Sequence, residues 1–161
     1  MQKIAYADLH CDSVTVCCDG GENMSDFDGQ TNVRKLIEAG CAAQCFALFT
    51  EGKNASADFK RYAEFYNVQI KSDPRVQPVL CYNDLLSARR GGKLAAILTV
   101  ENMGFLNGGV SGIKELKKLG VRMASLVWNT PNEFAFPNLI FRDGAPDFAA
   151  RETRGLTRLG K

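Results

Sequence analysis

The sequence LAAILTVEN, residues 94–102, contains the clearest strand signal of this chain. Its first seven residues are apolar apart from one threonine and do not alternate with charged residues, which predicts a strand buried on both faces. Comparable short apolar runs predict further strands at residues 4–10, 41–49, 76–80 and 121–128. Continuously apolar strands of this kind are typical of a parallel sheet that is covered by helices.

Helices are predicted between these strands. Residues 56–72 carry apolar side chains at helical spacing, with charged residues between them. Three further helices have recognisable ends: they are capped at Thr31, Asn83 and Ser111 and stop at Gly40, Gly91 and Gly120. This alternation predicts an α/β fold. A closed eight-stranded barrel needs about 250 residues, so the periodicity of this shorter chain by itself favours an open doubly wound sheet.

The composition is that of an ordinary globular protein, with 45% hydrophobic and 24% charged residues. A net charge of +2, with acidic and basic residues interspersed, argues against nucleic acid or an acidic membrane as a partner. Residues 1–6 contain one lysine and no long apolar run, so we expect no signal peptide and no membrane span, and we place the protein in the cytoplasm. The six cysteines show no C-x-x-C spacing, so neither a disulfide framework nor a zinc finger is expected.

Residues that can bind a metal follow two of the predicted strands. His10, the only histidine, and Asp12 stand two positions apart at the end of strand 4–10, so both point to the same side of an extended chain. Glu101 directly follows strand 94–100, where a carboxylate is costly to bury unless a cation pairs with it. Imidazole and carboxylate groups together suit a divalent ion such as zinc. On the residues alone, a histidine hydrogen-bonded to its neighbour and a glutamate on a solvated loop remain open as alternatives.

The same strand ends offer two further candidates. Trp128 and Asn129 lie where strand 121–128 meets the irregular stretch 129–155, although a tryptophan at a strand end more often packs than contacts a substrate. Cys11 beside His10 suggests a nucleophile and its base, but neighbouring residues of a strand point to opposite faces, which disfavours this pair. The other long stretch predicted to be irregular, residues 11–30, also follows a strand, where barrel enzymes build their active sites.

Taken together and in order, five segments of the chain resemble the membrane-dipeptidase family of zinc metallopeptidases. These segments are ADLHCDS (7–13), AGCAAQCFALF (39–49), ILTVENMG (97–104), GIKELKKLGVRMASLVWN (112–129) and RGLTRLGK (154–161). The resemblance implies that residues 1–161 are the N-terminal part of a single metal-dependent hydrolase domain. This part is an incomplete (β/α)8 TIM-type barrel with about the first five strands and their helices, and the remainder of the barrel is expected to be absent.

The resemblance also implies a reaction and a site. Family members hydrolyse dipeptides with a water molecule that is activated by two zinc ions. His10 and Asp12 match the ligands of the first strand, and Glu101 matches the catalytic carboxylate that bridges the two metals. Trp128 stands where other members have a histidine that assists substrate binding, and an indole cannot replace the imidazole as acid or base. We assign Trp128 and Asn129 to substrate binding.

The resemblance is incomplete in its ligands. Two further histidine ligands of the family have no counterpart, because His10 is the only histidine. We therefore expect a truncated metallodipeptidase that is inactive alone. The alternative is a non-catalytic, degenerate half-barrel with a structural or interaction role, whose open sheet edge is covered by a partner or by a second copy of the chain.

Overall fold

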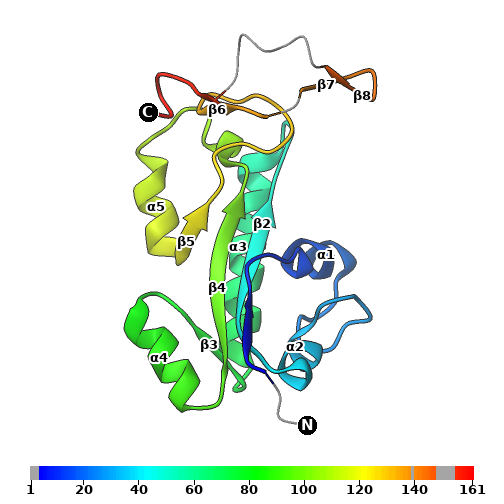
Figure 1. Cartoon of the computed structure of the whole chain (residues 1–161), viewed down its shortest axis with the longest axis vertical. Coiled ribbons are helices and arrows are strands. Elements are labelled where there is room, and N and C mark those ends of the chain that lie inside the picture. Colours follow the sequence, from blue (N-terminus) through cyan, green and yellow to red (C-terminus); the bar gives the residue numbers. More distant parts are fainter. Residues whose placement is uncertain (1–3, 139, 148–154) are drawn as a thin grey trace.

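The computed structural model describes residues 4–138, 140–147 and 155–161, and within them the strands and helices alternate as predicted. A five-stranded parallel sheet forms the centre of the molecule (Figure 1). Its strands are β1 (Tyr6–Asp8), β2 (Cys41–Phe49), β3 (Val76–Pro78), β4 (Leu94–Glu101) and β5 (Val121–Ala124). The helices around it are α1 (Ser13–Gly20), α2 (Val33–Ala39), α3 (Ala55–Ser72), α4 (Tyr82–Arg90), the short 3-10 helix η1 (Met103–Leu106) and α5 (Gly112–Leu119).

Strand β4 is the axis of this sheet. Along one edge it pairs with β2 over its length, while its other edge is shared by two strands. The N-terminal part of that edge, Leu94 to Ala96, pairs with β3, and the C-terminal part, Leu98 to Val100, pairs with β5. Strands β1, β2, β4 and β5 therefore follow one another across the sheet in chain order, and β3 lies below β5 on the same edge.

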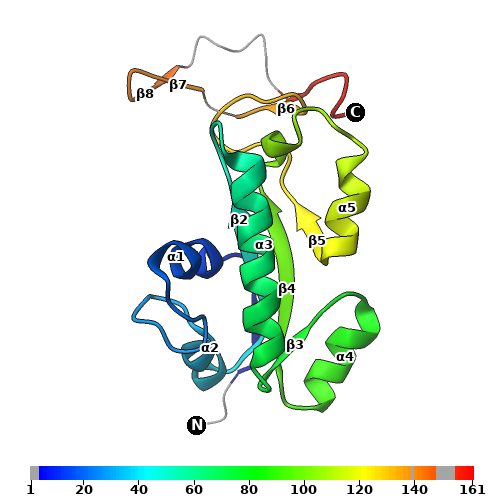
Figure 2. The ribbon, with the colours of Figure 1, turned by 180° about the vertical axis from the view of Figure 1, so that it is seen from behind.

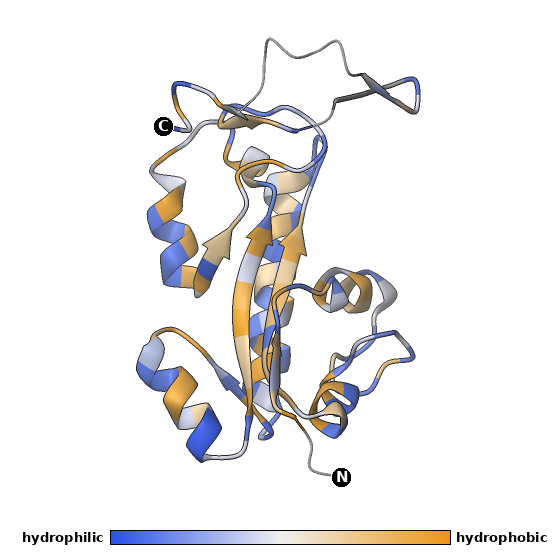
Figure 3. Cartoon of the chain, viewed as in Figure 1, coloured by the Kyte–Doolittle hydropathy of each residue, from blue (hydrophilic) through white to orange (hydrophobic). Residues whose placement is uncertain are grey.

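One face of the sheet is packed against helices. Figure 2 shows α3 running along the back of β2 and β4. The side chains that face α3 include Phe46 and Leu48, both fully buried, and the ring of Phe46 lies 5.9 Å from that of Tyr66 on the helix. Figure 3 shows the same strands mostly in hydrophobic colours, as expected for strands that are buried. Burial of this apolar surface is the main source of stability for the fold.

The opposite face is covered only in part. Leu85 and Ala88 of α4 pack against Ala43 and Ala95, at the N-terminal ends of β2 and β4. Toward the C-terminal ends of the strands, no helix within the described ranges lies over this face (Figure 1). Met123 of β5 is accordingly 45% exposed.

Several predicted boundaries were wrong. Asn32, not Thr31, caps α2, because its side-chain oxygen accepts a hydrogen bond from the Lys35 amide at 2.7 Å. Helix α4 begins after Cys81 rather than after Asn83, because Asp84 bonds back to the Cys81 amide. Ser111 precedes α5 as predicted but makes no side-chain cap.

The two stretches predicted to be irregular also contain regular structure. Residues 11–30 include α1, a short helix whose Val14 and Cys17 are fully buried. The described part of 129–155 contributes β6 (Ala135–Phe136), β7 (Ile140–Arg142), β8 (Ala145–Asp147) and, with Leu156, β9 (Gly155–Leu156). These form two antiparallel pairs, β6 with β9 and β7 with β8, while residues 139 and 148–154 lie outside the described residues. Among the described helices, none is both long and apolar enough to cross a membrane.

Candidate metal centre

The first element of the site is an interruption at the end of β1. Regular pairing stops where Asp8 faces Gln44 of β2 and resumes at Cys11, whose amide donates to the Cys45 carbonyl at 3.1 Å and whose carbonyl accepts from the Ala47 amide at 2.9 Å. These bonds set Cys11 opposite Phe46. From Asp8 to Cys11 the chain advances by three residues, while β2 advances by two, from Gln44 to Phe46. Such an extra residue is a β-bulge, and it turns His10 out of the regular ladder. The Asp8 side chain holds this turn by accepting the His10 amide at 3.2 Å.

His10 and Asp12 come together for a reason other than the predicted one. The alternation of side chains along an extended strand does not apply, because β1 ends at Asp8 and Asp12 is the residue before the first turn of α1. The chain turns at Asp12 into the helix, and this turn brings the carboxylate to the imidazole. The Nε2 atom of His10 lies 3.5 Å from Oδ1 of Asp12.

Glu101 reaches the same point from another strand. It is the last residue of β4, opposite Phe49 of β2. Its Oε2 atom lies 3.6 Å from His10 Nε2, and the ligand atoms of His10, Asp12 and Glu101 all lie within 4.8 Å of one another. The predicted juxtaposition of these three residues is confirmed, and it is the only cluster of this kind that the described residues contain.

The cluster brings two carboxylates close to each other, and a cation would offset their repulsion. Burial raises the pKa of Glu101, His10 opposes the rise, and the carboxylate of Asp12 adds to it. About three quarters of the Glu101 side chain is buried, whereas the side chains of His10 and Asp12 are half exposed. Two carboxylates that converge on one imidazole nitrogen at 3.5 and 3.6 Å are too far away for good hydrogen bonds.

The donor set can be compared with the requirements of zinc. Ligands that lie about 2 Å from a tetrahedral zinc ion are about 3.3 Å from one another, close to the two separations seen here. One imidazole and two carboxylates are also ligand types that zinc accepts. The residues present therefore fit a divalent ion, with positions left for donors from elsewhere.

The cluster is open to small molecules on two sides. His10 borders a hollow of about 200 Å³ together with Glu101, Met123 and Ser125. It also borders a second hollow, of about 500 Å³, formed with Asp12 and the loop that carries Thr31. His10 thus lines both hollows, one together with Glu101 and the other together with Asp12.

Trp128 and Asn129 lie in the loop after β5. The predicted strand 121–128 was therefore too long. Strand β5 ends at Ala124, since the chain of its partner β4 turns away directly after Glu101 and leaves the following residues without a pairing strand. The Trp128 ring packs edge-on against Phe49, with centroids 4.8 Å apart, and remains 40% exposed. Phe49 is the residue paired with Glu101, so Trp128 packs on the strand neighbour of Glu101. Asn129 is exposed.

Cys11 is not placed to act as a nucleophile. It is buried, and burial raises the pKa of its thiol to about 11, so the thiol stays protonated near neutral pH. The imidazole of His10 meanwhile faces the two carboxylates.

Two polar residues beside the cluster were not singled out from the sequence. Asp8 holds the backbone of His10, and Ser125 borders the same hollow as Glu101. Asp8 is the last residue of β1 and Ser125 directly follows β5, whereas the predicted strands 4–10 and 121–128 extended past both residues. A polar residue near the end of an apolar strand was the signal that could have indicated them.

A comparison with protein families places the chain. The sequence model of the family described as "Membrane dipeptidase (Peptidase family M19)" matches residues 1–161. The chain belongs to this family. Members of the family are metallodipeptidases. An imidazole and two carboxylates that converge in this chain are groups that can bind a metal. A comparison with curated proteins gave no match.

Solved structures of family M19 share the fold of this chain. The crystal structure of dipeptidase AC, a metallopeptidase of family M19, superposes with a TM-score of 0.82 at 18% identity, covering 99% of this chain and 52% of that one. A metallopeptidase from Rhodobacter sphaeroides, liganded with a phosphinate mimic of the dipeptide L-Ala-D-Ala, gives 0.81 at 17% identity, covering 99% of this chain and 54% of that one. The chain thus spans about half the length of these structures. Its parallel sheet matches the N-terminal part of their TIM-type barrel, so the barrel expected from the family resemblance is confirmed over the open doubly wound sheet.

Proposed function

We propose that this chain supplies one side of the active site of a zinc-dependent dipeptidase, with His10, Asp12 and Glu101 as metal ligands. The observation that carries the proposal is the convergence of the three side chains, from two strand ends far apart in sequence, within 4.8 Å. Membership of family M19 supports a metal-dependent peptidase reaction at this place. The proposal extends this to zinc and to two ions in the complete site.

Each residue has a distinct part in the proposal. His10 faces the carboxylates through Nε2, so this nitrogen would be the ligand atom. Asp12 would contribute a half-exposed carboxylate, and Glu101, the most buried of the three, would be the carboxylate shared between two ions. A zinc ion bound here would supply Lewis acidity, which polarises a peptide carbonyl and lowers the pKa of water. Burial is the main cause of the raised pKa of Glu101, with a further contribution from Asp12, and a bound cation would oppose both effects.

Dipeptides are the proposed substrates. The Rhodobacter sphaeroides metallopeptidase carries a mimic of L-Ala-D-Ala, which supports a small peptide with two residues as the ligand type for this fold. We assign the substrate-facing position to Trp128 and Asn129, because Trp128 packs on Phe49 beside Glu101 and offers a half-exposed apolar surface. An indole has one N–H donor and no acid–base function near neutral pH, so this position contributes contact rather than proton transfer.

We also propose that the chain alone has little or no dipeptidase activity. A zinc ion needs about four donors, and three side chains cannot satisfy two ions. This chain covers 52% and 54% of the two related structures. The remaining ligands are proposed to come from a segment equivalent to the part of those structures that it does not cover. The non-catalytic alternative, a half-barrel that binds a partner or its own copy, is favoured by the partly uncovered sheet face that includes Met123.

Zinc binding tests the proposal directly. Isothermal titration of the purified chain with Zn²⁺ should show one binding event that is abolished in His10→Ala and weakened at least about tenfold in Glu101→Gln. Glu115→Gln is the matched control. This glutamate lies on α5, outside the proposed site, and its exposed carboxylate forms an ion pair with Lys118. Absence of zinc binding, or equal loss in the control, would contradict the metal site.

Peptide hydrolysis separates the enzyme from the non-catalytic alternative. The chain alone should show little turnover of L,L and L,D dipeptides with added zinc. Turnover should appear when it is combined with the second half of a family M19 barrel and disappear with His10→Ala. Full activity of the chain alone would refute the need for a second half, and inactivity of a stable reconstituted barrel would favour the non-catalytic role.

A further inference from the structure

Glu101 is fixed on both sides by a single residue of the neighbouring chain segment. The amide of Ser125 donates to the carbonyl of Val100 at 2.9 Å, and the hydroxyl of Ser125 accepts the amide of Asn102 at 3.0 Å. These two bonds enclose the peptide groups before and after Glu101. Strand β5 has already ended at Ala124, so the Ser125 side chain replaces the backbone carbonyl that a further strand residue would have offered.

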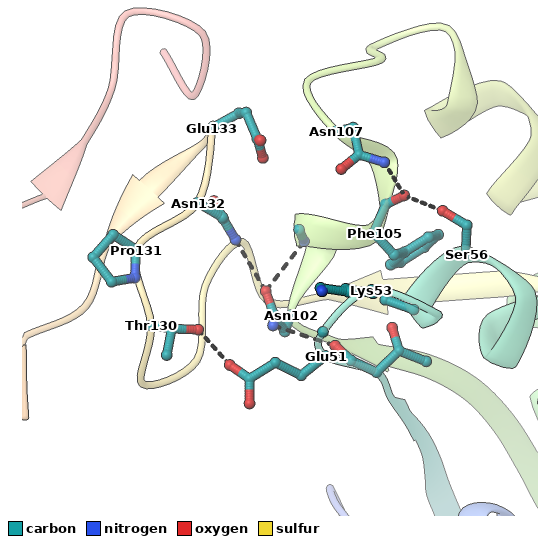
Figure 4. A pocket seen from close by; sticks show the side chains of 14 residues that line it. Glu51, Lys53, Ser56, Asn102, Phe105, Asn107, Thr130, Pro131, Asn132 and Glu133 are labelled. Carbon is teal, nitrogen blue, oxygen red and sulfur yellow. Dashed lines mark hydrogen bonds between the residues drawn. The ribbon is translucent and has the colours of Figure 1, made fainter.

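Asn102 then connects the end of β4 to three other segments. Its Nδ2 atom donates to the Thr50 carbonyl at 3.3 Å, and its Oδ1 atom accepts from the Gly104 amide at 3.1 Å and from Asn132 Nδ2 at 2.9 Å. Figure 4 shows this amide group at the centre, with Asn132 converging on it. Asn102 is 4% exposed, so these bonds are made away from competing water.

Asn132 extends the connection into the loop that carries the proposed substrate residues. Its Nδ2 atom also donates to the Leu126 carbonyl at 2.7 Å, and its Oδ1 atom accepts the amides of Phe134 and Ala135. Asn132 therefore bonds both ends of the loop, Leu126 and Phe134, and links this loop to Asn102. Because Trp128 lies within this loop, the position of the tryptophan and that of Glu101 depend on the same amide.

The backbone at Asn102 explains why the chain turns here. Its φ is 71°, in the region that favours glycine and, among the other residues, asparagine. This turn ends β4 directly after Glu101, so the glutamate side chain stands at the tip of the strand. Asn107, at the other end of η1, also has a positive φ, of 48°, but its backbone is left-handed helical, which that of Asn102 is not. Asn107 is exposed, and its side chain donates a 3.3 Å bond to the Phe105 carbonyl.

From these contacts we propose that Asn102 and Ser125 are positioning residues for the Glu101 carboxylate, a role that rests on the proposed metal site. Ser125 fixes the backbone on both sides of Glu101, and Asn102 fixes the direction in which the chain leaves it. Outer residues that orient metal ligands typically change metal affinity by about 10- to 100-fold when they are removed.

Five variants of the 161-residue chain test the role, two of them as controls. Asn102→Gly retains a residue that tolerates positive φ but removes the amide, and Asn107→Gly makes the same change at the other end of η1. Ser125→Ala removes the hydroxyl that accepts the Asn102 amide, Ser125→Thr restores a hydroxyl, and Ser111→Ala removes an exposed serine with no side-chain cap. Each variant is titrated with Zn²⁺ in a calorimeter and with Co²⁺ in the visible range, and its folding is followed by circular dichroism.

We expect Asn102→Gly and Ser125→Ala to bind zinc about tenfold or more weakly and to change the Co²⁺ spectrum, while Ser125→Thr recovers most of the affinity. Asn107→Gly and Ser111→Ala should match the original chain. Zinc affinity and Co²⁺ spectra unchanged in folded Asn102→Gly and Ser125→Ala would overturn the positioning role, even if thermal stability falls. Absence of zinc binding in the unsubstituted chain would instead overturn the metal site on which the role depends.

Discussion

Replacement of Asp73 by asparagine should destabilise the fold by an amount that the structure allows to be calculated. Asp73 follows α3, is 6% exposed, and receives bonds from Arg75 through Nη2 at 2.6 Å and Nε at 2.9 Å. The Ser25 hydroxyl donates to the same carboxylate at 2.8 Å. These contacts, with Arg75 the strongest, lower the pKa of Asp73 from 3.8 to about 2. A fall of this size corresponds to about 2 kcal/mol of stabilisation when the carboxylate is ionised.

The pH dependence follows from the sign of this shift. A carboxyl group whose pKa is lower in the folded state adds stability above its unfolded pKa near 4, and that stability is lost as the pH falls toward 2. Asp73→Asn should therefore lower the free energy of unfolding by about 2 kcal/mol at pH 7, and the difference from the original chain should shrink between pH 4 and pH 2.

Urea unfolding followed by circular dichroism at pH 7, 4 and 2.5 measures this difference. The control is Asp26→Asn, because Asp26 also pairs with an arginine, Arg34, but its side chain is 59% exposed and its ion pair is screened by solvent. A loss at Asp73 no greater than the loss at Asp26, or a loss that stays constant down to pH 2.5, would refute the assignment of this stability to a buried, ionised carboxylate.

Three further outcomes follow from features of the sheet. Phe46→Ala should cost about 3–5 kcal/mol in urea unfolding, because the side chain is fully buried against Tyr66; a cost below about 1 kcal/mol would contradict the packing. Trp128, the only tryptophan, packs on Phe49 beside Glu101, so zinc should change its fluorescence in the original chain and not in His10→Ala; an equal response in both would detach the tryptophan from the site. The chain should self-associate in light scattering, because β1 is a largely exposed edge and Met123 lies on an uncovered face, whereas a monodisperse monomer with a sharp thermal transition would contradict an open half-barrel.

The sequence predicted best those elements whose residues are buried on both faces. Strand β2 has the predicted bounds, and β4 differs by one residue, because long apolar runs leave few alternatives to a central parallel strand. The approach of His10 to Glu101 was also predictable, since the carboxyl ends of parallel strands reach the same edge of the sheet. Asp12 joins them, as predicted, but through the turn into α1 rather than through alternation along a strand. Their roles as metal ligands remain a proposal.

Features that depend on tertiary context were not predictable in the same way. The bulge before Cys11 depends on how β1 pairs with β2, and no local pattern in residues 4–12 indicates it. Helix α1 was missed because it is short. Of its eight residues only Val14 and Cys17 are apolar and fully buried, which is too few to produce a recognisable helical repeat. The early end of β5 depends on the turn at Asn102 in another segment, which a reading of residues 121–128 cannot include.

The division of one edge of β4 between β3 and β5 has a consequence for local unfolding. Strand β3 and helix α4 attach below β5, and α4 packs into a small cluster with Ala43 and Ala95 that is separate from the main core behind the sheet. Glu101 and its bonds to Ser125 lie at the opposite end of β4. Val76 of β3 belongs to the main core, so it is α4 that rests on the small cluster alone. Helix α4 is therefore expected to open while the upper part of the sheet stays paired, and its amides should exchange with deuterium faster than those of β2. The end of the molecule that carries the proposed metal ligands would remain closed during such openings.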